Sequence, residues 1–252
     1  MKKKAYAACV SDMCDSVSVI AVMCCFCRAG VKLIAGETAE HAYGGLLGVT
    51  NKFVGSFFYA AQLGFLAQAG VSNVARQTLA GGAYALLERK TNGGWLPRSD
   101  YWVATLWRRL IVGDSTEVRV VMAHRLSQPA PGVLVFAFCS SALQSGEAVG
   151  KLVVVNLDRR RGVEIQPLWE GCGSSGSGGR QAQREEWHMT GNVSVAAAVD
   201  GMRVNGQSPW LAGGEVAPRR ADPGSNLTVG AASIAFALQS LAGLSARQHH
   251  DT

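Results

Sequence analysis

Residues 31–37 read VKLIAGE and residues 53–69 read FVGSFFYAAQLGFLAQA, and the order of these two stretches decides the fold. The first is a short apolar run that ends in Gly-Glu, which predicts a buried strand with an acid at its end. In the second, apolar residues recur at helical spacing, and Thr50-Asn51 offers a cap in front of it. We therefore predict a strand, a glycine-rich loop and a helix over 53–69.

The alternation of strand and helix continues as far as Gly113. We predict a second strand over 71–79, a short strand over 84–88 and a second helix over 101–112, capped by Ser99-Asp100. This order is typical of a parallel α/β arrangement.

The pattern changes after Gly113 to short β-rich runs separated by turn residues. A Gly/Ser stretch at 171–179 is predicted to be a flexible loop. Seven runs without a helical period predict an antiparallel β-sandwich. The predicted strands are 117–124, 132–139, 151–157, 163–169, 185–189, 202–205 and 229–238.

The composition limits the class of protein. The chain has 252 residues, 48% of them hydrophobic and 17% charged, with a mean hydropathy of +0.12. These values exclude a highly charged disordered chain, a coiled coil and collagen. The net charge is +6, and all of the excess lies in residues 1–112, which hold 12 Lys/Arg and 6 Asp/Glu. This excess is too scattered for a nucleic-acid interface, so we expect no nucleic acid, but it suits an anionic ligand.

The first 30 residues are a leader of uncertain status. Lys2-Lys3-Lys4 and the apolar run 17–27 resemble a signal or anchor segment, while an alternative start of the chain explains them equally well. Five of the seven cysteines lie in this segment without zinc-ligand spacing, so we expect no metal and no cofactor. Cys139 is expected to be a small buried hydrophobe. Asn192 and Asn226 head two glycosylation sequons, which are compatible with secretion.

Glu37 is the strongest candidate in the sequence for a residue that carries out chemistry. It follows an apolar strand and precedes a glycine-rich loop, the place where a (β/α)₈ barrel carries its active site. A carboxylate there can act as nucleophile, base or metal ligand. From position alone, a structural role such as helix capping or pairing with an arginine explains it equally well.

A series of motifs in a fixed order points to a family. The chain resembles heparanase-like proteins of glycoside hydrolase family 79, and the plant type more than the animal type. The resemblance covers roughly residues 31–240 and is most specific over 33–110. The motifs that carry it are GET (36–38), AYGG (42–45), VTNKFV (49–54), SFFY (56–59), QLG (62–64), RQTL (76–79), GGAY (81–84), DYW (100–102) and LWRRL (106–110), with weaker echoes at 154–157, 184–190 and 233–236.

The resemblance implies a retaining β-glucuronidase. The implied fold is the carboxyl-terminal part of a (β/α)₈ TIM barrel, its last two strands and helices over residues 31–113, followed by an antiparallel β-sandwich over 114–240 and a disordered tail over 241–252. Glu37 matches the family nucleophile. The residues expected to bind substrate are Tyr43, Gly44, Gly45, Arg76, Gln77, Gly82 and Tyr84. For Arg76, pairing with a uronate carboxylate and a structural role both stay open.

The chain departs from the family pattern in three ways. The loop after Glu37 carries Glu40-His41 and is one residue longer, and Ala83 replaces the usual Asn. The family acid/base glutamate lies in an Asn-Glu pair, and this chain contains no Asn-Glu dipeptide. Neither Glu40 nor Glu88 has a motif that supports it as a substitute.

Two functions follow as hypotheses. The first is a heparanase-like hydrolase of O-glycosyl bonds that acts on glucuronide-containing glycans or glycosides, here truncated and lacking the acid/base half. The second is an inactive paralogue that binds carbohydrate or protein. Either is expected in the secretory pathway, extracellular or in the lysosome or vacuole, with peripheral membrane association as a third possibility. The sequence leaves the oligomeric state open.

Overall fold

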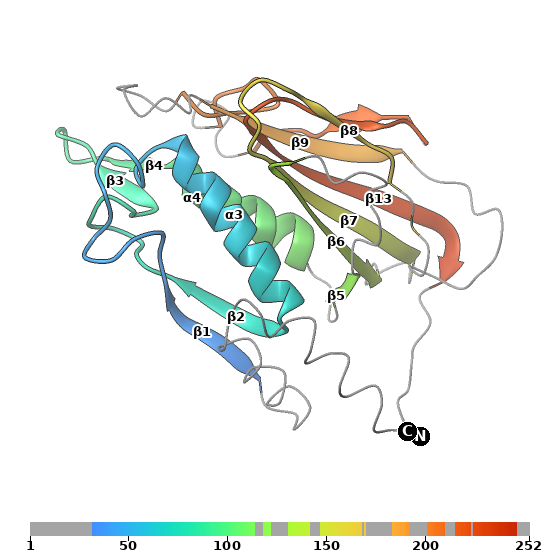
Figure 1. Ribbon diagram of the computed structural model, residues 1–252, viewed down its shortest axis with the longest axis horizontal. Coiled ribbons are helices and arrows are strands. Elements are labelled where there is room, and N and C mark those ends of the chain that lie inside the picture. The colour runs from blue at the N-terminus through green and yellow to red at the C-terminus, as the bar shows by residue number, and fades with distance from the viewer. Residues whose placement is uncertain are drawn as a thin grey trace.

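The computed structural model describes residues 32–113, 118–121, 131–141, 147–167, 169, 183–191, 201–209, 215–222 and 224–245. The leader 1–30, the Gly/Ser stretch 171–179 and the sequon residue Asn192 therefore lie outside the described residues. The helices lie between a two-stranded parallel sheet and a seven-stranded antiparallel sheet (Figure 1).

The first part of the chain is a parallel β-α-β unit. Strand β1 (Leu33–Thr38) pairs in parallel with β2 (Val71–Arg76), and helix α3 (Phe53–Gln68) connects them. A hairpin of β3 (Leu87–Arg89) and β4 (Trp95–Pro97) leads into helix α4 (Ser99–Leu106), which continues as the π-helix η1 (Trp107–Val112). The predicted order of strand, helix, strand and helix is confirmed.

Several predicted boundaries are wrong for local reasons. Glu37 lies within β1 rather than after it, and the predicted strand over 84–88 is a loop followed by β3. The Thr50-Asn51 cap does not form, because Thr50 Oγ1 donates to the Leu46 carbonyl and Asn51 Oδ1 accepts from the Gly48 amide. Lys52 and Arg98 occupy the N-cap positions of α3 and α4 without a side-chain cap.

The second part of the chain is mainly one antiparallel sheet of seven strands. The strand order is β10-β9-β13-β7-β6-β5, with β11 also paired to β9. The strands are β5 (Val118–Val121), β6 (Val133–Ser141), β7 (Glu147–Asn156), β9 (Arg184–Thr190), β10 (Arg203–Val204), β11 (Arg219–Ala221) and β13 (Ser233–Ser245).

A small second sheet covers one face of this large sheet. It consists of β8 (Val163–Ile165) paired with β12 (Leu227–Val229), and Ile165, Leu227 and Val229 pack on the β7 and β13 side chains. The predicted strand 229–238 is in fact two strands, because the chain turns at 230–232, where Ala232 has φ +43°. Strand β13 also runs to Ser245 and therefore includes the first five residues of the predicted disordered tail over 241–252.

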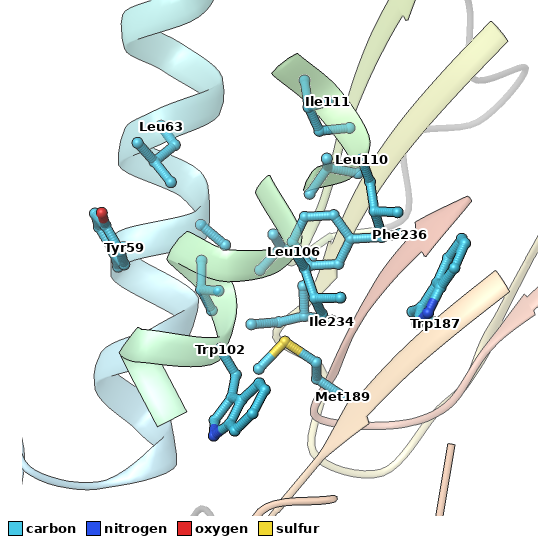
Figure 2. Close-up of a cluster of buried hydrophobic side chains, with 14 of the residues drawn as sticks. Tyr59, Leu63, Trp102, Leu106, Leu110, Ile111, Trp187, Met189, Ile234 and Phe236 are labelled. Carbon is cyan, nitrogen blue, oxygen red and sulfur yellow. The ribbon is translucent and has the colours of Figure 1, made fainter. Parts of the chain in front are cut away.

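The helices cover the other face of the large sheet. Phe53, Leu63, Trp102 and Leu106 point from α3 and α4 toward Met189, Ile234 and Phe236 of the sheet, as Figure 2 shows in part. This core is continuous from the helices to the sheet. It therefore fixes the β-α-β unit on the antiparallel sheet.

Cys139 differs from its expected state. It is 5% exposed in β6, and it is disulfide-bonded. The predicted burial of Cys139 is confirmed, whereas the prediction that it acts only as a small hydrophobe is wrong, because its sulfur takes part in a covalent bond.

Candidate active site

Two loops that follow the parallel strands lie together at one edge of the β1–β2 sheet. The strands run in the same direction, and Thr38 is in register with Arg76, so both carboxyl ends lie at that edge. The Gln77 amide donates to the Thr38 carbonyl at 2.8 Å and extends the pairing past the strands. This arrangement brings the loop after Glu37 beside the loop after Arg76.

Glu37 is exposed near the end of β1. Among the described residues, no hydrogen bond or ion pair engages its carboxylate, in contrast to the buried acids of this region. The described contacts of Glu37 show neither of the structural roles considered above, which are pairing with an arginine and capping a helix. An exposed, unpaired carboxylate at a strand end is free to meet a ligand.

The glycines in the two loops permit a close backbone approach. The Ala83 amide donates to the Gly44 carbonyl at 2.6 Å. A Cβ at Gly82 would lie 2.7 Å from that carbonyl oxygen, and one at Gly45 would lie 2.9 Å from the Tyr84 nitrogen. Both glycines have positive φ, +77° and +91°. Only glycine satisfies both conditions without strain.

The predicted substrate-binding residues fall into two groups. Tyr43, Gly44, Gly45, Gly82 and Tyr84 lie in the two joined loops, and the Tyr43 side chain is fully exposed with a backbone φ of +53°. A non-glycine residue in this region of φ is uncommon and is concentrated at functional sites.

Arg76 forms the other group, with Gln77 beside it. The Arg76 side chain is only 4% exposed, and its guanidinium contacts Glu40 at 2.5 Å and Asp100 at 2.9 Å. It also donates to the Tyr84 carbonyl at 3.1 Å and to the Gln77 carbonyl. Of the two roles that the sequence leaves open for Arg76, these contacts favour the structural one.

Glu40 and Asp100 are residues of this region whose role sequence reasoning missed. The sequence predicts that Asp100 caps a helix, but Asp100 is buried within α4 and accepts a hydrogen bond from Ser56 of α3 at 2.6 Å. Burial, together with the neighbouring Asp100 carboxyl, raises the pKa of Glu40 to about 8. The available signal was the extra residue in the loop after Glu37, which is where Glu40 lies.

Glu40 and Glu88 are both poor substitutes for the missing acid/base. The Glu40 carboxyl is 6% exposed and engaged by Arg76, so a glycosidic oxygen cannot reach it in this arrangement. Glu88 lies on β3, where it pairs with Arg98 at 3.3 Å and has a half-exposed side chain.

A second buried polar cluster lies in the antiparallel sheet. Glu186 of β9 contacts Arg184 at 2.7 Å and His188 at 2.8 Å, and Arg184 also donates to the Ser225 and Asn226 carbonyls. Burial works to raise the pKa of Glu186, but the hydrogen bonds from His188 and Arg184 outweigh it and lower the pKa. These mutually satisfied groups tie β9 to the segment before β12. Nearby, the sequon residue Asn226 is exposed, with its side-chain amide 3.3 Å from Glu164.

No group of three His, Cys, Asp or Glu side chains is placed to hold a metal ion within the ranges that the structure describes. None of the described helices combines the length and the apolarity that a membrane span requires.

The chain is similar in sequence to parts of several heparanase-like proteins and of a β-glucuronidase. No protein-family model matches it. It is 31% identical over 165 residues to baicalin-β-D-glucuronidase of Scutellaria baicalensis, which is 65% of this chain and 27% of that protein. It is 35% identical over 125 residues to heparanase-like protein 1 of Arabidopsis thaliana, 50% of this chain and 20% of that protein. Over 83 residues it is 35% identical to heparanase of Gallus gallus, 32% of this chain and 15% of that protein. These matches therefore span about a quarter of the length of the relatives or less.

Solved structures share the fold at low sequence identity. The α-L-arabinofuranosidase of Thermotoga maritima superposes with a TM-score of 0.51 at 15% identity, over 85% of this chain and 44% of that one. The protein BuGH86, solved with neoagarooctaose, gives 0.53 at 11% identity, over 85% and 31%. At such identities the likeness shows only that this chain shares its fold with parts of these two structures.

Proposed function

Because the chain is homologous to the heparanase-like proteins, we propose that it carries the nucleophile part of a retaining β-glucuronidase, which acts on glucuronide-containing glycans or glycosides. The observation that carries the proposal is the position of Glu37. It is an exposed and unpaired carboxylate at the carboxyl end of a parallel strand, beside two loops held together by glycines.

The proposed chemistry needs two carboxyl groups about 5–5.5 Å apart. Glu37 attacks the anomeric carbon and forms a glycosyl ester, while the second group protonates the leaving oxygen and then activates water. No Asn-Glu dipeptide marks that second group in this chain. We therefore assign to this chain only the nucleophilic attack, which can form the glycosyl ester without an acid when the leaving group departs unprotonated.

The proposed architecture follows from the same relationship. In it, β1, α3, β2 and α4 are the last two strand–helix units of a TIM barrel, and the antiparallel sheet with β8–β12 is the attached sandwich. The parallel pairing of β1 and β2 supports this, as do the helices on one face of the pair. An excess of positive charge over residues 1–112 accords with an acidic sugar.

We also place the protein in the secretory pathway. The disulfide at Cys139 supports an oxidising compartment, where such bonds persist. The exposed sequon residue Asn226 is accessible for glycosylation there.

A second candidate is a binding module without turnover. It is favoured by the missing Asn-Glu motif, because a nucleophile without an acid leaves ordinary glucuronides intact. It predicts retention on an anionic glycan column and no reaction with any glucuronide.

An activated substrate separates the two candidates. We expect 2,4-dinitrophenyl β-D-glucuronide to release about one equivalent of dinitrophenolate per chain, because this leaving group departs without protonation. Glu37→Gln should abolish the burst. Glu88→Gln, the matched change of an exposed and paired acid, should keep it. An equal burst in Glu37→Gln contradicts the assignment, and no burst from the unaltered chain supports the binding module.

A further inference from the structure

Three charged side chains from separate segments meet in the interior next to the joined loops. Arg76 ends β2, Asp100 lies in the first turn of α4, and Glu40 lies in the loop that follows β1. Their side chains are only 4–6% exposed, and the Arg76 guanidinium contacts both carboxyls. This cluster connects the loop that follows β1 to strand β2 and helix α4.

The cluster contains two carboxyls and one cation. Ser56 donates a hydrogen bond to Asp100, and the Tyr59 and Tyr84 rings lie 5.0 and 5.7 Å from the centre of the guanidinium. Burial raises the pKa of Tyr59 to about 12, so its hydroxyl stays neutral. A buried negative charge without a partner is costly. A proton on one of the two acids removes that net negative charge.

The Glu40 carboxyl has an oxygen that can carry this proton. Glu40 Oε1 accepts from Arg76, whereas Oε2 is buried without a hydrogen-bond partner. Asp100 uses both of its oxygens, one toward Ser56 and one toward Arg76. Burial and the Asp100 carboxyl raise the pKa of Glu40 to about 8, so near neutral pH it holds the proton.

Glu40 also anchors the loop in which it lies to the rest of the protein. Among residues 39–43, it is the one whose side chain the described contacts link to other elements, because the exposed His41 contacts only the neighbouring Ala42 carbonyl. Three residues beyond Glu40 the chain enters the Tyr43–Gly45 segment, which approaches Gly82 and Tyr84.

From these contacts we propose that Glu40 is a positioning residue: it fixes the Tyr43–Gly45 segment against β2 and α4, and it does so only while Glu40 is protonated beside the Asp100 carboxylate. The importance of this segment for substrate rests on the function proposed above, whereas the order of the loop does not. The order of the loop can therefore be tested whether or not the protein turns over a glycoside.

Amide hydrogen exchange measures the loop directly. The Gly45 amide donates to the Ala42 carbonyl and the Ala83 amide to the Gly44 carbonyl, so both report the folded loop. With rates corrected for the intrinsic effect of pH, we expect their protection to be constant from pH 6 to 7 and to fall roughly tenfold or more through pH 8–9.

Three variants identify the group responsible. Glu40→Gln keeps a neutral acceptor for Arg76, so its loop should stay protected over the whole range. Glu40→Ala should lose protection at every pH, and Glu88→Gln, which changes an exposed Glu–Arg pair, should behave as the unaltered chain. Amides of the β7–β13 ladder show in each variant that the rest of the protein is folded.

Two results would overturn the proposal. One is full protection of Gly45 and Ala83 in a folded Glu40→Ala protein. The other is a fall in protection near pH 8 that persists in Glu40→Gln.

Discussion

Lys151 is an unusual residue in the middle of the antiparallel sheet. It lies in β7, it is only 4% exposed, and its ammonium donates to the Ile111 carbonyl of the π-helix at 2.7 Å. Burial lowers the pKa of Lys151 from 10.5 to about 8. The contact satisfies a carbonyl at the end of the helix, where a positive charge is favoured.

This residue makes stability depend on pH in a defined direction. Between about pH 8 and 10.5, the unfolded chain binds a proton at Lys151 that the folded chain has released. Stability should therefore rise with pH across this window, by at most about 1.4 kcal/mol per pH unit from this residue. Urea unfolding at several pH values measures the slope.

Lys151→Met should remove that contribution. The difference in slope between it and the unaltered chain isolates the residue from other groups that titrate in the same window. Lys90→Met, which alters an exposed lysine, should leave the slope unchanged. An identical pH dependence in Lys151→Met and the unaltered chain would show that the buried amine stays charged throughout.

At the scale of elements, helix α3 shows what the sequence predicts well. Its apolar spacing predicted 53–69, and the helix is observed over Phe53–Gln68. Its cap was wrong, because Thr50 and Asn51 have competing partners within the turn before it. The apolar spacing predicted where the helix lies but not its buried face, since Phe58 and Phe65 are 48% and 53% exposed. A cap, in turn, depends on one local choice of hydrogen bond.

The close packing of α3 on strand β6 requires a glycine at position 64. A Cβ at Gly64 would lie 2.5 Å from the Phe136 ring of β6. Alanine usually stabilises a helix by about 1 kcal/mol relative to glycine, but overpacking a core typically costs about 1–3 kcal/mol. We expect Gly64→Ala to lose roughly 1–2 kcal/mol of unfolding free energy in urea.

The control for this change is Gly94→Ala. There the nearest atom to the added Cβ is at 3.5 Å, an ordinary contact, so stability should change little. If Gly64→Ala were more stable than the unaltered chain, the helix would not pack on Phe136 as described.

At the scale of the molecule, one core joins the two predicted parts. Leu63 and Trp102 from the helices share it with Met189 and Phe236 from the sheet (Figure 2). The predicted boundary at Gly113 thus falls between segments that pack on each other. The order of elements was predictable because hydrophobic periodicity records burial.

What escaped prediction depends on pairing between distant residues. The acid–arginine cluster joins positions 40, 76 and 100, and the disulfide engages Cys139. The meeting of the two glycine loops likewise follows from the parallel register of β1 and β2, which the sequence implies only once a parallel sheet is assumed. The order of motifs still indicated which residues lie in those loops.

The central claim is that Glu37 is a nucleophile, and covalent labelling tests it most directly. 2-Deoxy-2-fluoro-β-D-glucuronosyl fluoride loses fluoride without help from an acid and leaves a slowly hydrolysed ester on a retaining nucleophile. Mass spectrometry of the digested protein should find one added fluoroglucuronosyl group, on Glu37, and none in Glu37→Gln. Labelling of a different carboxylate, or no labelling of the folded chain, would contradict the account.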